Sequence, residues 1–181
     1  MPSHHPPHIY VDQTWYMITA STLKHAPFLS SEAAKVLVRD KLLELVQIYE
    51  ISLRAWVILN NHYHLLLKTN VGRDLSRCIG RLHGNTSKQL NLQEGVVGRQ
   101  IWHNYWDSCI RTERDLWTRF NYIHQNPVNH GYVRNMKHWP FSSYHYYLKE
   151  KGFEWLQDCW QRYPVVDHLE EHGPDAYSGL T

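Results

Sequence analysis

The chain has 181 residues, of which 43% are hydrophobic and 20% are charged, and its formal net charge at pH 7 is +2. This length suits one compact domain around a single hydrophobic core. The composition excludes an intrinsically disordered chain, and no uninterrupted apolar stretch of about 20 residues indicates a membrane span. The small net charge neither requires nor opposes a nucleic-acid partner.

The N-terminal residues and the cysteines bear on the compartment. Residues 1–9 contain several His and Pro residues but no apolar core typical of a secretory signal, so we expect a flexible arm and a cytoplasmic protein. Cys78, Cys109 and Cys159 are odd in number and widely spaced, which indicates neither a disulfide framework nor a cysteine metal site. We divide the chain into an arm at 1–9, a domain at 10–150 and a C-terminal extension at 151–181.

Strand and helix patterns alternate along the domain. Short runs of aromatic and β-branched residues predict strands, and apolar residues at helical spacing predict helices. In chain order we expect a strand at 15–20, a helix from Ser30 or Ser31 to Tyr49, strands at 51–59 and 62–68, a helix at 72–92, a strand at 101–111, a helix from Thr112 or Glu113, and a short helix at 142–150. The helix that starts near residue 112 should stop at Asn126, because a residue before proline disfavours helical geometry.

This order of elements predicts an α+β fold. Strand, helix, strand, strand, helix, strand is the split β-α-β arrangement of ferredoxin-like and RRM-like domains, which is an antiparallel sheet with helices on one face. The helix that starts near residue 112 follows this unit as an additional element.

Two sets of residues are candidates to bind nucleic acid. The helix at 72–92 carries four basic residues between its apolar positions, which predicts one basic side that could neutralise phosphates. These residues are Arg73, Arg77, Arg81 and Lys88. Exposed aromatic residues such as Tyr63 or Trp106 could stack on unpaired bases. The alternative for the basic residues is an ordinary solvated helix face. The alternative for the aromatic residues is ordinary core packing.

Two further constellations could carry chemistry. His62 and His64 lie two apart at the start of a strand, so both imidazoles project from the same face of the sheet. In an apolar run, two such rings are costly unless they are hydrogen-bonded or coordinate a metal. Tyr122 and Asn126 are four apart and share one helix face. Each constellation alone is a weak indication, but together they offer two nitrogen ligands, an amide oxygen and a phenol that can approach one point.

These residues resemble the single-tyrosine HUH transposases and, within them, the REP-associated tyrosine transposases. The resemblance covers about residues 10–150 and rests on four stretches in consistent order: Asn-His-Tyr-His-Leu-Leu-Leu at 61–67, Ile101-Trp102 with Tyr105-Trp106-Asp107, Tyr-Ile-His-Gln-Asn-Pro-Val at 122–128, and Trp-Pro-Phe-Ser-Ser at 139–143. It implies that His62 and His64 are metal ligands, that Tyr122 is the nucleophile, and that Asn126 is the third protein ligand.

The resemblance also implies a reaction. We expect an enzyme that nicks and rejoins single-stranded or hairpin-containing DNA through a 5′-phosphotyrosine intermediate, with Mg²⁺ or Mn²⁺ and without a nucleotide cofactor or a membrane partner. Imidazole ligands also suit zinc, so the ligand types alone do not settle the metal. Related enzymes include monomers and swapped dimers, and a homodimer with shared active sites is therefore one alternative.

Two other classes of function remain open. The split β-α-β sheet is also the scaffold of RNA-recognition domains, so the chain could be a non-catalytic nucleic-acid-binding module, although no RNP-like aromatic motif lies at the expected strand. A zinc hydrolase built on the histidine pair would need another His, Cys or carboxylate ligand and a general base. Substitution of Tyr122 by Phe should abolish covalent DNA attachment and leave both alternatives unaffected.

Overall fold

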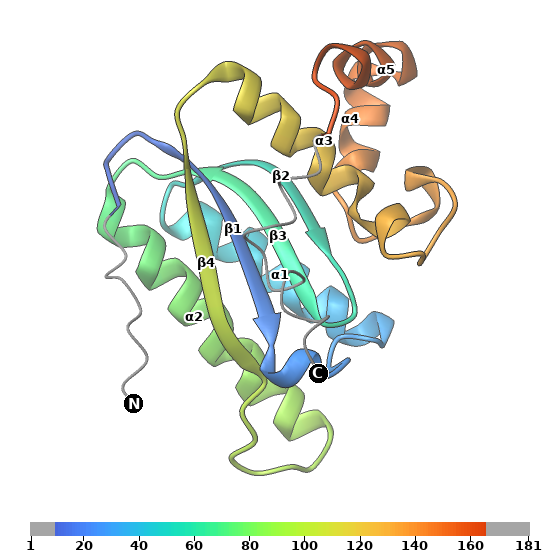
Figure 1. The fold of residues 1–181 in the computed structure, drawn as a ribbon. Helices are drawn as coiled ribbons and strands as arrows, with labels where there is room; N and C mark the ends of the chain where they lie inside the picture. The colour runs from blue at the N-terminus through green and yellow to red at the C-terminus, as the bar shows by residue number, and fades with distance from the viewer. Residues whose placement is uncertain (1–9, 166–181) are drawn as a thin grey trace.

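Four strands form one antiparallel sheet in the order β2-β3-β1-β4 in this computed structural model, which describes residues 10–165. The strands are β1 (Trp15–Thr22), β2 (Ser52–Ile58), β3 (His62–Lys68) and β4 (Trp102–Ile110). The helices are α1 (Glu32–Ile48), α2 (Gly72–Gln93), α3 (Glu113–Asn129), α4 (Tyr144–Lys151) and α5 (Phe153–Arg162), with short 3₁₀ turns η1 (Leu23–His25) and η2 (Met136–His138). The predicted α+β fold and its split β-α-β order are confirmed (Figure 1).

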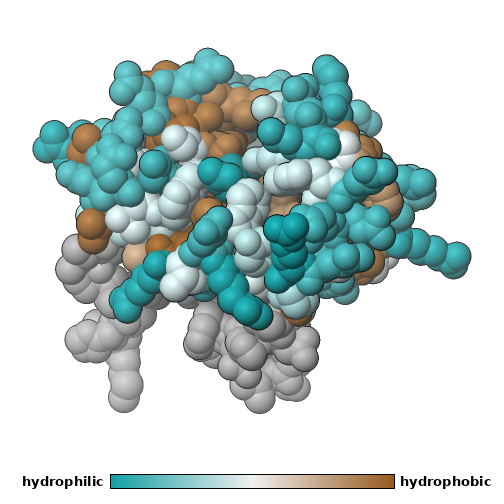
Figure 2. Space-filling model, turned by 90° about the horizontal axis from the view of Figure 1, so that it is seen from above, coloured by the Kyte–Doolittle hydropathy of each residue, from teal (hydrophilic) through white to brown (hydrophobic). Residues whose placement is uncertain are grey.

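The helices form two layers around the sheet. Helices α1 and α2 pack on one face, whereas α3, α4 and α5 lie on the side of the other face (Figure 1). Helix α3, the additional helix, contacts β2 and β3. Seen from above, the surface is mostly hydrophilic, with smaller hydrophobic areas between the polar residues (Figure 2). Within residues 10–165, no helix combines the length and the apolar character that a membrane crossing requires.

Strand alternation divides the sheet residues between the two layers. In β1, Ile18 belongs to the core under α1 and α2, whereas its neighbour Met17 belongs to the core under α3. Thr19 therefore faces α3, and it lies opposite His64 in the antiparallel pairing of β1 with β3. Because side chains alternate with a period of two, His62 shares that face with His64. The strand register thus places both histidines under α3.

Helix α3 is longer than the sequence predicts. The expected stop at Asn126 is wrong, because the helix continues to Asn129 with Pro127 inside it. A proline this close to the C-terminus removes only one late hydrogen bond, which the last turn tolerates. The helix ends where Gly131 adopts φ +71°, a left-handed conformation that glycine takes without steric cost. Asn126 is consequently held by regular helical backbone, one turn after Tyr122.

The segment around the Trp-Pro-Phe-Ser-Ser stretch covers the edge of β2. Trp139 Nε1 donates a hydrogen bond to the Ile58 carbonyl oxygen at 3.1 Å, and the Ile58 N–H donates to the Phe141 carbonyl oxygen at 2.9 Å. The Ser143 N–H donates to the Trp56 carbonyl oxygen at 2.9 Å. These bonds fix the segment to the strand that leads into the β2–β3 turn.

The C-terminal segment holds a helix that the sequence did not predict. Helix α5 packs against α3, where Asn121 Nδ2 donates to the carbonyl oxygens of Cys159 at 3.0 Å and of Tyr163 at 2.8 Å. The described part of the predicted extension, 151–165, therefore packs onto the helix that carries Tyr122. The predicted arm at 1–9 lies outside the described residues.

Candidate active site

The structure brings the four predicted site residues together. The ring centroids of His62 and His64 are 5.0 Å apart, and that of His64 is 5.4 Å from the Tyr122 ring. His62 Nε2 lies 3.3 Å from Asn126 Oδ1. All four residues are at most 4% exposed. Strand β3 therefore supplies two imidazoles and helix α3 supplies a phenol and an amide to one buried cluster, with every group from a single chain.

Neighbouring polar side chains hold both imidazoles. Thr19 Oγ1 lies 2.8 Å from His64 Nδ1, across the β1–β3 pairing. Asn61, in the turn before β3, places Oδ1 2.7 Å from His62 Nδ1. In each ring the hydrogen bond occupies Nδ1, so Nε2 is the nitrogen left to serve as a metal ligand. Such outer partners orient imidazole ligands in metal sites.

A third histidine lies beside this cluster and was missed by the sequence analysis. The His130 ring centroid is 4.9 Å from that of His62, and the residue is the C-cap of α3, where its backbone N–H donates to the Asn126 carbonyl oxygen. His130 follows Asn126 by four residues and so continues the Tyr122–Asn126 helix face. The assumption that Pro127 ends the helix hid this relation. Within residues 10–165, no three His, Cys, Asp or Glu side chains form a group that could hold a metal ion.

Arg119 is a second residue that the sequence analysis missed. It precedes Tyr122 by three residues on α3, and its Nη1 lies 3.3 Å from Met17 Sδ in β1. Its Nε donates to Asp115 Oδ1 at 2.7 Å, and the Arg119 side chain is 17% exposed. A largely buried guanidinium therefore lies between α3 and the sheet face that carries Thr19. The i−3 spacing from the predicted nucleophile was the available signal.

His124 belongs to the packing of α3 and not to the cluster. Its Nε2 lies 2.8 Å from Ser143 Oγ, and its ring packs edge-on against Phe120 with centroids 4.3 Å apart. Complete burial lowers the pKa of His124 from 6.5 to about 3, because the charged imidazolium would lose its hydration. The ring is therefore neutral at pH 7, and its interactions lie on a different side of α3 from those of Tyr122.

The two predicted base-stacking residues have different outcomes. The prediction that Tyr63 is exposed is wrong, since the residue is 1% exposed and its hydroxyl lies 2.8 Å from His83 Nε2. Tyr63 stands between His62 and His64 in β3, and alternation turns it into the core under α1 and α2. Trp106 is half-buried and pairs with Thr19 in the β1–β4 register, so it remains a candidate next to the cluster.

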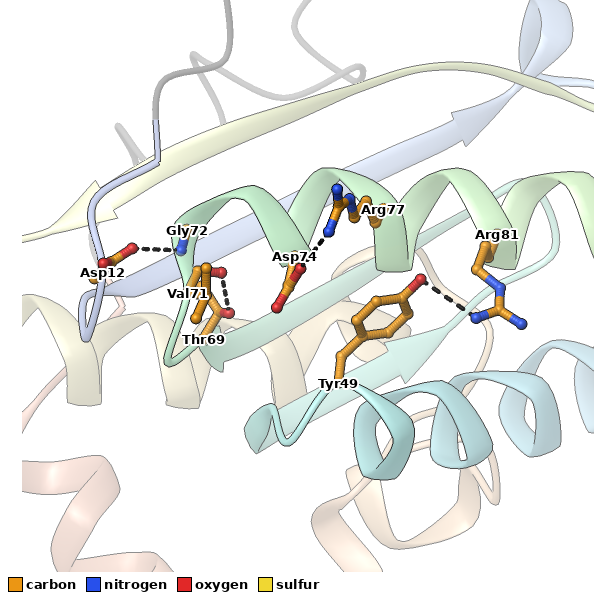
Figure 3. Close-up of polar contacts among 8 residues, drawn as sticks. All are labelled: Asp12, Tyr49, Thr69, Val71, Gly72, Asp74, Arg77 and Arg81. Atoms are coloured by element: carbon orange, nitrogen blue, oxygen red, sulfur yellow. Dashed lines mark hydrogen bonds and ion pairs between the residues drawn. The ribbon is translucent and has the colours of Figure 1, made fainter.

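The predicted basic side of α2 exists but lies away from the cluster. Arg73, Arg77, Arg81 and Lys88 are all exposed. Arg77 pairs with Asp74 at 3.2 Å, and Arg81 reaches the Tyr49 hydroxyl at 3.4 Å (Figure 3). Helix α2 packs on the sheet face opposite to the one that carries the histidines. These residues therefore stay predicted phosphate contacts for DNA that extends beyond the catalytic cluster.

Comparison with known proteins identifies the family of this chain. The sequence model of the family described as Transposase IS200 like matches residues 10–126. A Haemophilus influenzae protein whose name assigns it to the REP-associated tyrosine transposases is 33% identical over 113 residues, which are 54% of this chain and 61% of the relative. The REP-associated tyrosine transposase of Escherichia coli K12 is 26% identical over 133 residues, or 73% of this chain and 76% of the relative.

A solved structure shares the fold. It is a REP-associated tyrosine transposase bound to a REP hairpin, with a TM-score of 0.69, 22% sequence identity, and coverage of 82% of this chain and 87% of the other. At this identity the likeness establishes the arrangement of strands and helices. The chain spans less than two thirds of the Haemophilus relative's length.

Proposed function

The chain belongs to the IS200-like transposase family, and from this premise we propose that it nicks and rejoins single-stranded DNA with Tyr122 as its nucleophile. The observation that carries the proposal is the contact of the Tyr122 ring with His64, at 5.4 Å between centroids. Two relatives named as REP-associated tyrosine transposases, and a solved one bound to a REP hairpin, support hairpin-containing DNA as the substrate. One chain supplies the whole cluster, so this reaction does not require a homodimer.

Hydrogen bonds around His62 support a metal ion at this site. Asn61 Nδ2 donates to the His25 carbonyl oxygen at 3.2 Å, which turns Asn61 Oδ1 toward His62. Since Oδ1 can only accept, His62 Nδ1 carries the proton and Nε2 presents a lone pair. That lone pair points toward Asn126 Oδ1, another acceptor, at 3.3 Å. A cation between the two acceptors would turn an unfavourable contact into coordination.

The donor set fits a divalent ion. His62, His64 and Asn126 would hold Mg²⁺ or Mn²⁺, and the two imidazoles leave zinc as a competitor to be tested. When bound, the ion supplies positive charge that offsets the negative charge developing on the scissile phosphate. Arg119 lies three residues before Tyr122 on the same helix, with its charge partly offset by Asp115 at 2.7 Å. Positive charge next to Tyr122 would stabilise the phenolate that attacks, because a neutral phenol is a weak nucleophile.

Cleavage and rejoining are the same transesterification in opposite directions. The Tyr122 oxygen bonds to phosphorus on the 5′ side as the bond from phosphorus to the 3′ oxygen breaks, and the proton lost by the phenol is balanced by one gained by the released 3′-hydroxyl. A 3′-hydroxyl then attacks the phosphotyrosine, restores a phosphodiester and frees the phenol. Because the covalent intermediate keeps the energy of the phosphodiester, no ATP is consumed.

Adduct formation tests this proposal. Purified protein is incubated with a labelled hairpin oligonucleotide carrying single-stranded flanks, with Mg²⁺, Mn²⁺ or Zn²⁺ or with a chelator, and covalent adducts are resolved on a denaturing gel. We expect a metal-dependent adduct with the wild type and with the control Tyr146→Phe, whose tyrosine is 61% exposed on α4. Tyr122→Phe should give no adduct while still binding the DNA. An adduct that survives in Tyr122→Phe overturns the assignment, and hairpin binding without any adduct indicates a non-catalytic module.

A further inference from the structure

A pocket opens beside the candidate active site, at the end of the β2–β3 hairpin. Its volume is about 370 Å³, which is the size of a small-molecule site. It is lined by groups from α1, from the β2–β3 turn and from the segment after α3. These include Lys35, Asn60, Tyr132, His138, Trp139 and Phe141.

Two short connections join this pocket to the cluster of His62, His64, Tyr122 and Asn126. Asn60 precedes Asn61, the residue that orients His62. On the other side, the ring of Tyr132 lies 6.2 Å from that of His130, which in turn lies 4.9 Å from that of His62. A group held in the pocket is therefore close to His62, at the near end of the cluster.

The lining combines aromatic rings with one buried cation. The ring centroids of Tyr132 and Trp139 are 5.1 Å apart with a tilt of 33°. The Lys35 ammonium lies 5.4 Å from the Trp139 ring centroid and 5.7 Å from that of Phe141. Lys35 is 3% exposed and donates to the carbonyl oxygen of Leu29 at 2.7 Å. These bonds hold a charged donor rigidly against an aromatic wall.

The chemistry of this lining selects a flat ring with acceptors on its edge. An ammonium has three donors, and the carbonyl oxygens of Leu29 and Ser30 use two of Lys35, so the third can serve a ligand. The amide of Asn60 can both donate and accept, as the edge of a nucleobase requires. A phosphate suits the pocket less well, because Glu32 also lines it. Aromatic faces bind unpaired bases by stacking.

We propose that this pocket holds the base of one unpaired nucleotide next to the scissile phosphodiester. The proposal rests on the proposed function, since it needs single-stranded DNA at the cluster. The base would lie against Tyr132 and Trp139 with its edge toward Lys35 and Asn60. Its insertion would fix the position of the neighbouring phosphate relative to Tyr122, so the pocket would help to choose the cleaved bond.

Photochemical cross-linking tests the location of the base. Hairpin oligonucleotides that carry 5-iodouracil at one unpaired position at a time are bound to Tyr122→Phe protein, which cannot cleave them, and irradiated. Cross-linked peptides are then identified by mass spectrometry. We expect one position, within about two nucleotides of the cleavage site mapped with wild-type protein, to cross-link to Tyr132 or Trp139. Cross-links confined to other parts of the chain overturn the proposal.

Base removal tests the energetic role. An abasic site at the same position should weaken binding about 5- to 150-fold, the range that stacking of one base provides. Tyr132→Leu should reduce this ratio toward one, whereas the exposed control Tyr146→Leu should keep it, with the thermal unfolding of both variants measured to confirm that they fold. Trp139 is a poorer choice because it also bonds to β2.

The two proposals fail in different ways. If the wild type forms adducts equally fast with the abasic and the intact oligonucleotides, and no cross-link reaches the pocket, the base pocket is wrong and the tyrosine mechanism stands. If no hairpin DNA binds or forms an adduct, the proposed function fails and the pocket assignment fails with it. An unchanged ratio in a folded Tyr132→Leu protein also contradicts the pocket assignment.

Discussion

The two faces of the sheet are made by the same strands but have different contents. Under α1 and α2, side chains such as Ile18, Leu65 and Leu67 are completely buried and form a hydrocarbon core. Under α3, hydrocarbon packing around Met17 and Leu66 continues for only part of the strands.

The remaining part of the α3 face is polar. There β1 and β3 present Thr19, Ser21, His62 and His64, each at most 6% exposed. Burying polar groups costs stability unless each finds a partner, so packing alone does not favour this composition. The difference between the faces is consistent with a stabilising role for the α1/α2 face and with the reaction that we propose for the polar cluster on the α3 face.

Substituting adjacent residues of β3 should separate these roles most sharply. His64→Ala removes a proposed metal ligand, and we expect adduct formation to fall by more than about 100-fold, because loss of even an outer-shell partner costs about 10- to 100-fold. Leu65→Ala opens a cavity on the other face and should lower the free energy of unfolding by about 2–5 kcal/mol. Denaturant unfolding and the adduct assay measure the two effects on the same preparations.

The proposed division of roles between the two faces is contradicted if His64→Ala and Leu65→Ala show the same loss. Leu65→Ala, assayed at a temperature where it remains folded, should keep adduct formation within a few-fold of the wild type. If its activity falls as far as that of His64→Ala, the two faces are not functionally separate. A large loss of stability in His64→Ala would likewise show that the imidazole is a packing residue.

Thr19 should show a smaller effect on the polar face. Thr19→Val keeps the shape of the side chain but removes the hydroxyl that lies 2.8 Å from His64 Nδ1. We expect the affinity for Mn²⁺ to fall about 10- to 100-fold, the usual consequence of losing an outer-shell partner. Calorimetric titration of Mn²⁺ into each protein measures this affinity. Thr19→Ser restores the hydroxyl and should recover most of the affinity, whereas equal binding by all three proteins would contradict an orienting role.

Strand and helix periodicity predicted much of this contrast. The two-residue spacing of His62 and His64 placed both rings on one face, and the same alternation should have excluded Tyr63 as a stacking surface. The position of Pro127 suggested a helix stop, but the neighbouring backbone tolerates proline in a last turn that Gly131 closes. That single error also hid His130, which lies on the extra turn.

Other features depend on contacts between distant residues. Helix α5 is held to α3 by Asn121, whose partners Cys159 and Tyr163 lie about 40 residues later in the chain. The i−3 spacing from Tyr122 could have singled out Arg119, but its contact with Met17 became visible only when α3 was placed over the sheet. Local periodicity carries no information about either arrangement, so the fold and the four-residue cluster were predictable while their supporting layer was not.

The packing of α3 should give the stability of the protein a pH dependence that does not involve the proposed metal ligands. The pKa of His124 is about 3 in the folded chain and 6.5 in the reference state, so the unfolded chain binds the extra proton between these values. The contribution of His124 to the free energy of unfolding is therefore complete above about pH 6.5. It falls as the pH drops, by at most about 1.4 kcal/mol per pH unit for one group.

Urea unfolding between about pH 7.5 and pH 4.5 checks this expectation, because that range crosses the pKa of His124 in the unfolded chain and stays above the value of about 3 in the folded chain. His124→Gln removes the titrating ring and keeps a polar group near Ser143, so its free energy of unfolding should decline less steeply than that of the wild type. Parallel decline in the two proteins would show that His124 is not neutral and buried as the structure places it.

The smallest expected effect concerns the basic residues of α2, on the far side of the sheet from Tyr122. Arg77→Gln and Lys88→Gln should each reduce the slope of log affinity against log salt concentration by about 1, because each lost phosphate contact releases one fewer counterion. Neither should change the rate of adduct formation at saturating DNA. Arg119→Gln should do the reverse, slowing the reaction at saturation with little change in the slope.

This contrast separates basic residues that contribute to DNA binding from a basic residue that contributes to the reaction. The exposed groups of α2 can attract a DNA backbone over a long range, but the sheet separates them from the phosphate at Tyr122. Arg119 lies three residues before Tyr122 on α3, where its charge can act on the proposed nucleophile. If Arg77→Gln and Lys88→Gln leave the salt slope unchanged, the basic side of α2 is a solvated helix face. The DNA path would then run along the other side of the sheet, past Trp106 and the β2–β3 turn.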